Sequence, residues 1–268
     1  MASSVAEHPV SIEDDVPTIY AISVIAFIVG DVLHEGVGHA LLAFLTGAKS
    51  GVLSTVAWSS AFDSRLVAAG GTLVNLAAGI VFWVALRALP EASAQLRFFL
   101  LLSSAFNLFD ATGYFFFSGV TDFGDWAAVI AGVHPHWLWR AGLVVFGIAA
   151  YYGAVLVVGY AIVRYVGVPK NDVKRQRKLT VLPYISAIVV SGVAGLLNPV
   201  GIQLVWQSAL PATAGANCGL LWMRHYIPKG TRPEQTGPIE RNYTWVGMAV
   251  VFALLFIFVL GRGIKLHR

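Results

Sequence analysis

The sequence predicts an all-α fold, a polytopic bundle of about six membrane-spanning helices. Of the 268 residues, 57% are hydrophobic and only 12% are charged, whereas soluble domains are about a quarter charged. The mean hydropathy is +0.72. The apolar residues are grouped in runs long enough to cross a bilayer, which takes about 20 residues. This composition excludes an ordinary soluble domain.

Each predicted span is a long apolar run that ends at polar residues or at proline. A chain within lipid must satisfy its backbone hydrogen bonds internally, so continuous runs predict helices, whereas a barrel would need short alternating strands. Residues 198–223 are apolar but are interrupted by Pro199 and Pro211, so they form either a further crossing or a re-entrant segment. The other predicted spans are 19–45, 66–89, 96–117, 141–163, 179–197 and 243–260.

The predicted organisation has three parts: a flexible N-terminal tail at 1–18, a three-span core at 19–135, and additional transmembrane helices at 136–268. The segment 169–178 is rich in Lys and Arg, and short basic loops stay in the cytoplasm. Four spans precede this loop, so the N-terminus is predicted to be cytoplasmic as well. The net charge of +4 therefore indicates membrane topology rather than nucleic-acid binding. The single cysteine, Cys218, excludes an intramolecular disulfide.

The first predicted span contains a group of ionisable residues, namely Asp31, His34, Glu35 and His39. At membrane depth each costs about 2.5–3.5 kcal/mol, so such residues indicate a function or a shared partner. Two histidines beside a glutamate are the usual parts of a hydrolytic zinc centre, in which imidazoles bind the metal and the carboxylate takes a proton from water. The cluster therefore predicts either a hydrolytic metal site or a buried polar network within the bundle.

The spacing of the histidines departs from the standard His-Glu-x-x-His pattern, because His39 follows His34 by five residues. On a regular α-helix these rings would point about 140° apart, and one metal ion could not bridge them. A π-bulge accommodates one extra residue, and two nearby glycines permit it. We therefore predict a π-bulge or a break between the histidines. Asp31, Glu35 and His39, each four residues apart, form an alternative set on one helix face.

Three motifs occur in order along the first three predicted spans: HEGVGHAL at 34–41, GTLVNLAAG at 71–79, and NLFD at 107–110 followed by TDFGDW at 121–126. Together they resemble the site-2 protease family of intramembrane zinc metalloproteases, including its shorter bacterial relatives. The likeness covers about residues 20–135. The first motif has one residue more than the family's, and the family's compact Leu-Asp-Gly is absent.

The resemblance implies a role for each motif. His34 and His39 would be zinc ligands, and Glu35 the general base. Asn75 and Asn107 would hold the substrate strand or polarise its carbonyl group. The first and third spans run parallel, so the three motifs should converge near one membrane face.

An aspartate would be the third zinc ligand, and three candidates are present. Asp125 ranks first, because an apolar helical run follows it; Asp122 ranks second and Asp110 third. The alternative interpretation is that Asp125 only caps the N-terminus of a helix.

The predicted function is that of an intramembrane zinc metalloendopeptidase, with Zn²⁺ as cofactor, that hydrolyses peptide bonds of membrane-protein substrates. The alternative is a non-enzymatic or degenerate relative that acts as a metal-binding or membrane interaction protein. The expected partners are a membrane-protein or peptide substrate and the lipid bilayer, with no nucleic acid. The resemblance implies a multi-pass protein of a bacterial inner membrane. A transporter would need paired broken helices in two halves, and the sequence has one such polar cluster.

Overall fold

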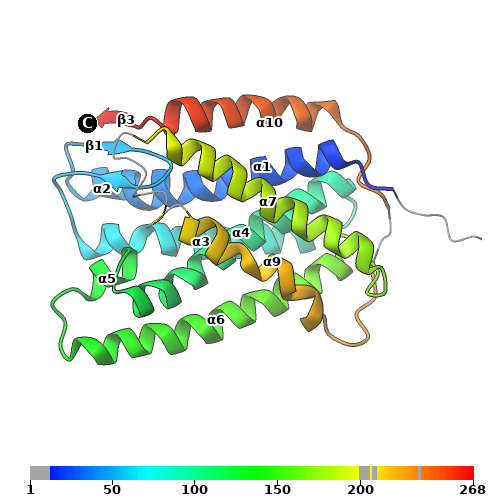
Figure 1. Ribbon diagram of the computed structural model, residues 1–268, viewed down its shortest axis with the longest axis horizontal. Coiled ribbons are helices and arrows are strands. Elements are labelled where there is room, and N and C mark those ends of the chain that lie inside the picture. The colour runs from blue at the N-terminus through cyan, green and yellow to red at the C-terminus, as the bar shows by residue number, and fades with distance from the viewer. Residues whose placement is uncertain (1–12, 199–205, 207–209, 235–236) are drawn as a thin grey trace, which may run out of the picture.

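Long apolar helices lie side by side along the whole molecule, with a small sheet at one end (Figure 1). The computed structural model describes residues 13–198, 206, 210–234 and 237–268. Among these, six helices are long and apolar enough to cross a membrane, which confirms the predicted fold class. They are α1 with its continuations (Val16–Thr46), α3 (Arg65–Ala88), α4 (Ala94–Thr121), α6 (His136–Arg164), α7 (Val173–Leu196) and α10 with its continuation (Tyr243–Leu260).

The first helix, α1 (Val16–Val32), begins earlier than the sequence suggests. Asp15 caps it by accepting a hydrogen bond from the backbone N–H of Thr18, and Pro17 fits the first turn, where no N–H is needed. Asp14 forms a buried ion pair with Arg175 at 2.8 Å. The tail predicted at 1–18 is therefore wrong over residues 13–18, which are structured.

A three-stranded antiparallel sheet was not predicted. Strand β1 (Ser50–Leu53) lies between β2 (Trp58–Ser59) and β3 (Ile264–His267). Such short strands show no clear alternation of apolar and polar residues, and β3 comes from the far end of the sequence. The sheet holds the C-terminal residues beside the connection that follows the first span.

Of the segment 198–223, residues 199–205 and 207–209, with Pro199, lie outside the described part of the chain, but its two ends can be placed. The amide of Asn198 donates to the hydroxyl of Ser54, beside the sheet. The ammonium group of Lys170, at the opposite end, donates to the carbonyl of Ile227. The chain therefore changes ends between Asn198 and Ile227. In its described part it uses the short helices η3 (Pro211–Gly215), η4 (Ala216–Cys218), α9 (Gly219–Trp222) and η5 (Met223–Tyr226).

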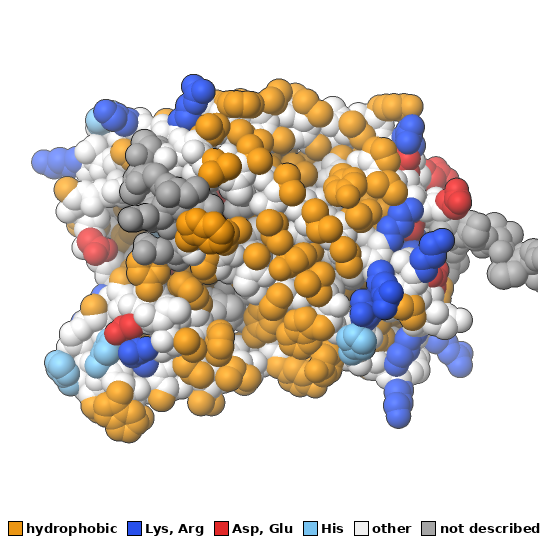
Figure 2. Space-filling model, viewed as in Figure 1, with side chains coloured by type: hydrophobic (Ala, Val, Ile, Leu, Met, Phe, Trp, Pro, Cys, Tyr) orange, Lys and Arg blue, Asp and Glu red, His pale blue; other side chains and the backbone are white. Residues whose placement is uncertain are grey.

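The core is centred on α4, which packs against α1, α3 and α6. Its Phe98 and Phe109 are completely buried. Large apolar side chains also point outward, among them Val81, Val145 and Val189. Figure 2 shows hydrophobic side chains over the middle of one face and Lys and Arg gathered at both ends. An apolar belt between charged ends is the surface that a membrane-spanning bundle presents to lipid.

Candidate metal centre

The two histidines lie on a π-helix, η1 (Leu33–Leu41), which continues α1 and passes into α2 (Leu42–Thr46). In a π-helix the hydrogen bonds join residues five apart, so His34 and His39 share one face. Their ring centroids are 4.8 Å apart and their Nε2 atoms 3.2 Å apart. The predicted π-bulge is confirmed, and it removes the conflict between the five-residue spacing and a shared site.

Helix α3 approaches this π-helix closely through glycine. A Cβ atom on Gly38 would lie 2.4 Å from the Cα of Gly71. A Cβ on Gly71 would lie 2.5 Å from the Nε2 atoms of both His34 and His39. Real Cβ atoms do not approach so closely, so both positions require glycine for space. The close approach also brings the carbonyl of Val67 to 2.7 Å from His39 Nδ1.

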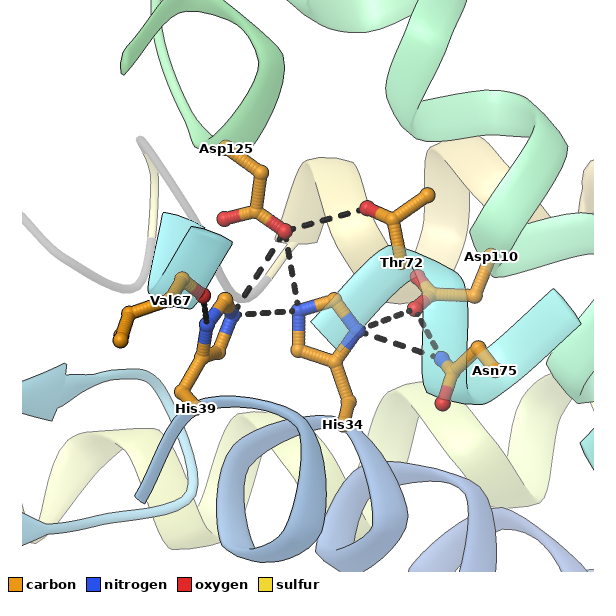
Figure 3. A network of polar contacts seen from close by, with 7 residues as sticks. All are labelled: His34, His39, Val67, Thr72, Asn75, Asp110 and Asp125. Carbon is orange, nitrogen blue, oxygen red and sulfur yellow. Dashed lines mark hydrogen bonds and ion pairs between the residues drawn. The ribbon is translucent and has the colours of Figure 1, made fainter. Parts of the chain in front are cut away.

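Asp125 is the aspartate that meets both histidines. It opens the short helix α5 (Asp125–Ile130), and its Oδ2 lies 3.3 Å from His34 Nε2 and 3.5 Å from His39 Nε2 (Figure 3). The hydroxyl of Thr72 donates to the same oxygen. Burial alone would raise the pKa of Asp125, but hydrogen bonds from the two histidines, when these are protonated, lower that pKa well below its usual value. His34, His39 and Asp125 form a cluster that could hold a metal ion.

The other two candidate aspartates lie elsewhere. Asp122 pairs with His136 at 3.0 Å and with Arg140 at 3.6 Å, outside the cluster. Asp110 does reach His34, but from the opposite side of the ring, with its Oδ2 3.2 Å from Nδ1. Neither contacts both histidines, so the structure supports the ranking of Asp125 as the first candidate.

The hydrogen bonds of the rings determine what the cluster can bind. The Val67 carbonyl only accepts, so His39 carries its proton on Nδ1. The Asp110 carboxylate likewise accepts from His34 Nδ1. In the neutral imidazoles both Nε2 lone pairs then face the carboxylate of Asp125. Three such acceptors repel one another unless protons or a metal cation lie between them, so the neutral arrangement suits a metal ion.

The two predicted asparagines lie in different surroundings. The Asn75 amide donates to Asp110 at 2.6 Å and lies 3.2 Å from His34 Nδ1, behind the ring rather than over the cluster. Asn107 is completely buried and faces Gly30 of α1, about one turn before the cluster. It is not among the residues that line the three cavities described for this region. The expectation that Asn107 contacts substrate stays a prediction.

Glu35 lies between two cavities. One is a cleft of about 360 Å³, bounded by residues 56–63 and by His39 and Asp125. The other is an inner cavity of about 40 Å³, enough for one water molecule. The Glu35 carboxylate accepts from the backbone N–H of Trp58, and its buried Oε2 has no hydrogen-bond partner among the described residues. Glu35 thus lines the same cleft as His39 and Asp125.

Several residues of the site were not identified from the sequence. Tyr114 stacks on His34, with ring centroids 5.2 Å apart; its place four residues after Asp110, on the same face of α4, was a usable signal. Thr72 lies inside the second motif. Val67 and Trp58 act through backbone groups, which no residue pattern reveals.

Comparisons with protein-family models, with curated proteins and with solved structures find no match for this chain. Its class is therefore defined by the fold and the site: a membrane-spanning helix bundle with two buried histidines and a partly buried aspartate that could hold a metal ion.

Proposed function

We propose that this protein is an intramembrane zinc metalloendopeptidase that hydrolyses peptide bonds of membrane-protein substrates, with the chemistry of the site-2 proteases that its motifs resemble. One observation carries the proposal. The possible ligands His34, His39 and Asp125 converge beside a cleft, and Glu35, whose Oε2 has no hydrogen-bond partner among the described residues, lines the same cleft. A closed structural metal site needs neither a cleft nor a base.

The distances within the cluster fit zinc. Zinc bonds to imidazole nitrogen and carboxylate oxygen are about 2.0–2.2 Å long and tetrahedral, which puts two ligand atoms roughly 3.3–3.6 Å apart. The three separations among His34 Nε2, His39 Nε2 and Asp125 Oδ2 are 3.2, 3.3 and 3.5 Å. Three protein ligands leave the fourth position open, as in catalytic zinc sites. Imidazole ligands also disfavour magnesium and calcium, which prefer oxygen.

The protein's own residues would each have a defined part in the reaction. Zinc, when bound, supplies a Lewis acid that polarises a peptide carbonyl and activates water. Glu35 accepts a proton from the attacking water and delivers it to the amine nitrogen as the peptide C–N bond breaks. Val67 and Asp110 keep each imidazole in the tautomer that leaves Nε2 free. We extend the proposal, from the same resemblance, to a location in a bacterial inner membrane.

A pair of aspartate variants tests the proposal. Asp125→Asn weakens a ligand, so we expect at least roughly a tenfold loss of zinc affinity, together with loss of cleavage of reconstituted transmembrane peptides. Asp122→Asn makes the same chemical change outside the cluster and should keep one zinc per chain and full activity. Zinc is measured by elemental analysis and cleavage by mass spectrometry. Wild-type protein without zinc would contradict the proposal. Wild-type protein that holds zinc but cleaves no peptide of a broad panel would favour the non-enzymatic alternative.

A further inference from the structure

A second, apolar cavity lies beside the candidate metal centre, between α4, α6 and the short helices of residues 211–226. Its volume is about 500 Å³. Binding pockets for organic ligands span about 300–1,000 Å³, and an engineered cavity of about 150 Å³ already binds benzene. The cavity therefore has room for more than one large side chain. Its walls include the aromatic residues Phe116, Phe117, Tyr152, Trp222 and Tyr226.

Tyr114 lies between this cavity and the candidate metal centre. Its ring stacks on the His34 imidazole at an angle of 27°. The same side chain borders the apolar cavity, the cleft over Glu35 and His39, and the inner cavity. One aromatic side chain thus lies between the candidate ligands and the apolar space, and a peptide bound in the cleft would have neighbouring side chains beside it.

The chemistry of the walls restricts the occupant. No charged residue is among the described residues that line the cavity. The hydroxyl of Tyr151 is already satisfied, since it donates to the carbonyl of Ala216 and accepts from the N–H of Gly219. A polar occupant would lose its hydrogen bonds to water with little in exchange. The occupant should therefore be large and apolar.

We propose that this cavity is the subsite for large apolar side chains of a transmembrane substrate segment, next to the bond that is cleaved. The proposal rests on the proposed function and adds to it a preference for Phe, Leu or Trp over Ala beside the cleavage site. We commit to a peptide segment rather than a lipid chain because the cavity adjoins the site: Tyr114 and Ala212 line both it and the inner cavity beside the cluster.

The first test changes the cavity without touching the metal cluster. Gly215 lines the cavity and has helical backbone angles. A Cβ atom at this position would have no other atom within 4 Å. The side chain of Gly215→Leu therefore fits there and reduces the volume of the cavity. Gly153→Leu is the matched control, because this glycine on α6 is equally open and lies outside the cavity lining. Two synthetic transmembrane peptides, one rich in Phe and one with Ala in its place, serve as substrates, with cleavage sites mapped by mass spectrometry.

We expect wild type and Gly153→Leu to prefer the Phe peptide by roughly 10–200-fold in kcat/KM, the range that apolar pockets achieve. Gly215→Leu should lose most of that preference through a higher KM for the Phe peptide, with unchanged zinc content. Equal cleavage of both peptides by wild type, or an unchanged preference in Gly215→Leu, would overturn the subsite.

The second test needs no cleavage. Cys218, the single cysteine, lines the cavity, so its alkylation by N-phenylmaleimide reports occupancy in the Glu35→Gln background. The Phe peptide should slow alkylation and the Ala peptide should not. Alkylation that responds to lipid chain length in nanodiscs but not to the Phe peptide would identify a lipid site and overturn the proposal. Protection of Cys218 by the Phe peptide without any cleavage by wild type would support the subsite and contradict the proposed hydrolase activity. Cleavage without protection of Cys218 would support the hydrolase activity and contradict the subsite.

Discussion

Each histidine of the cluster uses one ring nitrogen to fix its orientation and presents the other to Asp125. For His39 the fixing group is the backbone carbonyl of Val67, and for His34 it is the carboxylate of Asp110. Asp110 was considered as a ligand from the sequence, but its contact with Nδ1 makes it a positioning residue. The residue types of the site could be predicted from the sequence; the partner of each ring nitrogen could not, because the partners lie on other helices.

Asp110→Asn should lower zinc affinity by roughly 10–100-fold, the usual effect of losing a group that orients a ligand. An amide oxygen carries no full charge, so it accepts a weaker hydrogen bond from His34 Nδ1 than the carboxylate does, and the ring is held less firmly with its proton on Nδ1. The measurement is competition with a chromophoric chelator. Asp31→Asn makes the same substitution in the lining of the same inner cavity and serves as control. Equal losses in both variants would show that Asp110 has no special role in orienting His34.

At the level of the elements, the site depends on a π-helix packed against a glycine of α3. The sequence predicted the π-bulge from the spacing of His34 and His39, and that element is confirmed. It predicted permissive glycines, but not that Gly38 would face Gly71 across the interface. Helix spacing is set by packing between segments that are distant in the sequence, so local pattern alone could not give it.

Gly71→Ala should abolish stoichiometric zinc binding while leaving the bundle folded. The added methyl group would lie 2.5 Å from both Nε2 atoms, so the rings must move away from Asp125. Gly192→Ala on α7 is the control, because its Cβ would meet nothing within 4 Å and alanine favours a helix over glycine. Zinc content and thermal unfolding are measured on both. Full zinc content in Gly71→Ala would show that the close approach is not needed.

For the whole molecule, the ends of the six predicted spans match those of the observed helices to within six residues, because long apolar runs are visible from hydropathy. The terminal contacts were missed: the sheet joins the C-terminal residues to β1, and Asp14 joins the start of α1 to α7. The further pass ending near Ile227 was left open because its helices are short and interrupted by proline. Contacts between the two ends of a sequence leave no local signal.

Asp14→Asn should destabilise the protein by about 3–5 kcal/mol, since it leaves the guanidinium group of Arg175 buried without its counter-charge. Asp15→Asn is the control: asparagine also caps helices, and the partner Arg241 is exposed, so the loss should stay below about 1 kcal/mol. Denaturant titration in detergent measures both. Comparable small losses would show that the ion pair contributes little.

Cleavage and zinc content of Glu35→Gln test whether Glu35 activates water at a metal held by the two histidines and Asp125. Glutamine has the size of glutamate but cannot accept the proton. We expect one zinc per chain, as in wild type, and loss of transmembrane-peptide cleavage by at least roughly two orders of magnitude. Retained cleavage, or zinc lost together with activity, would contradict it.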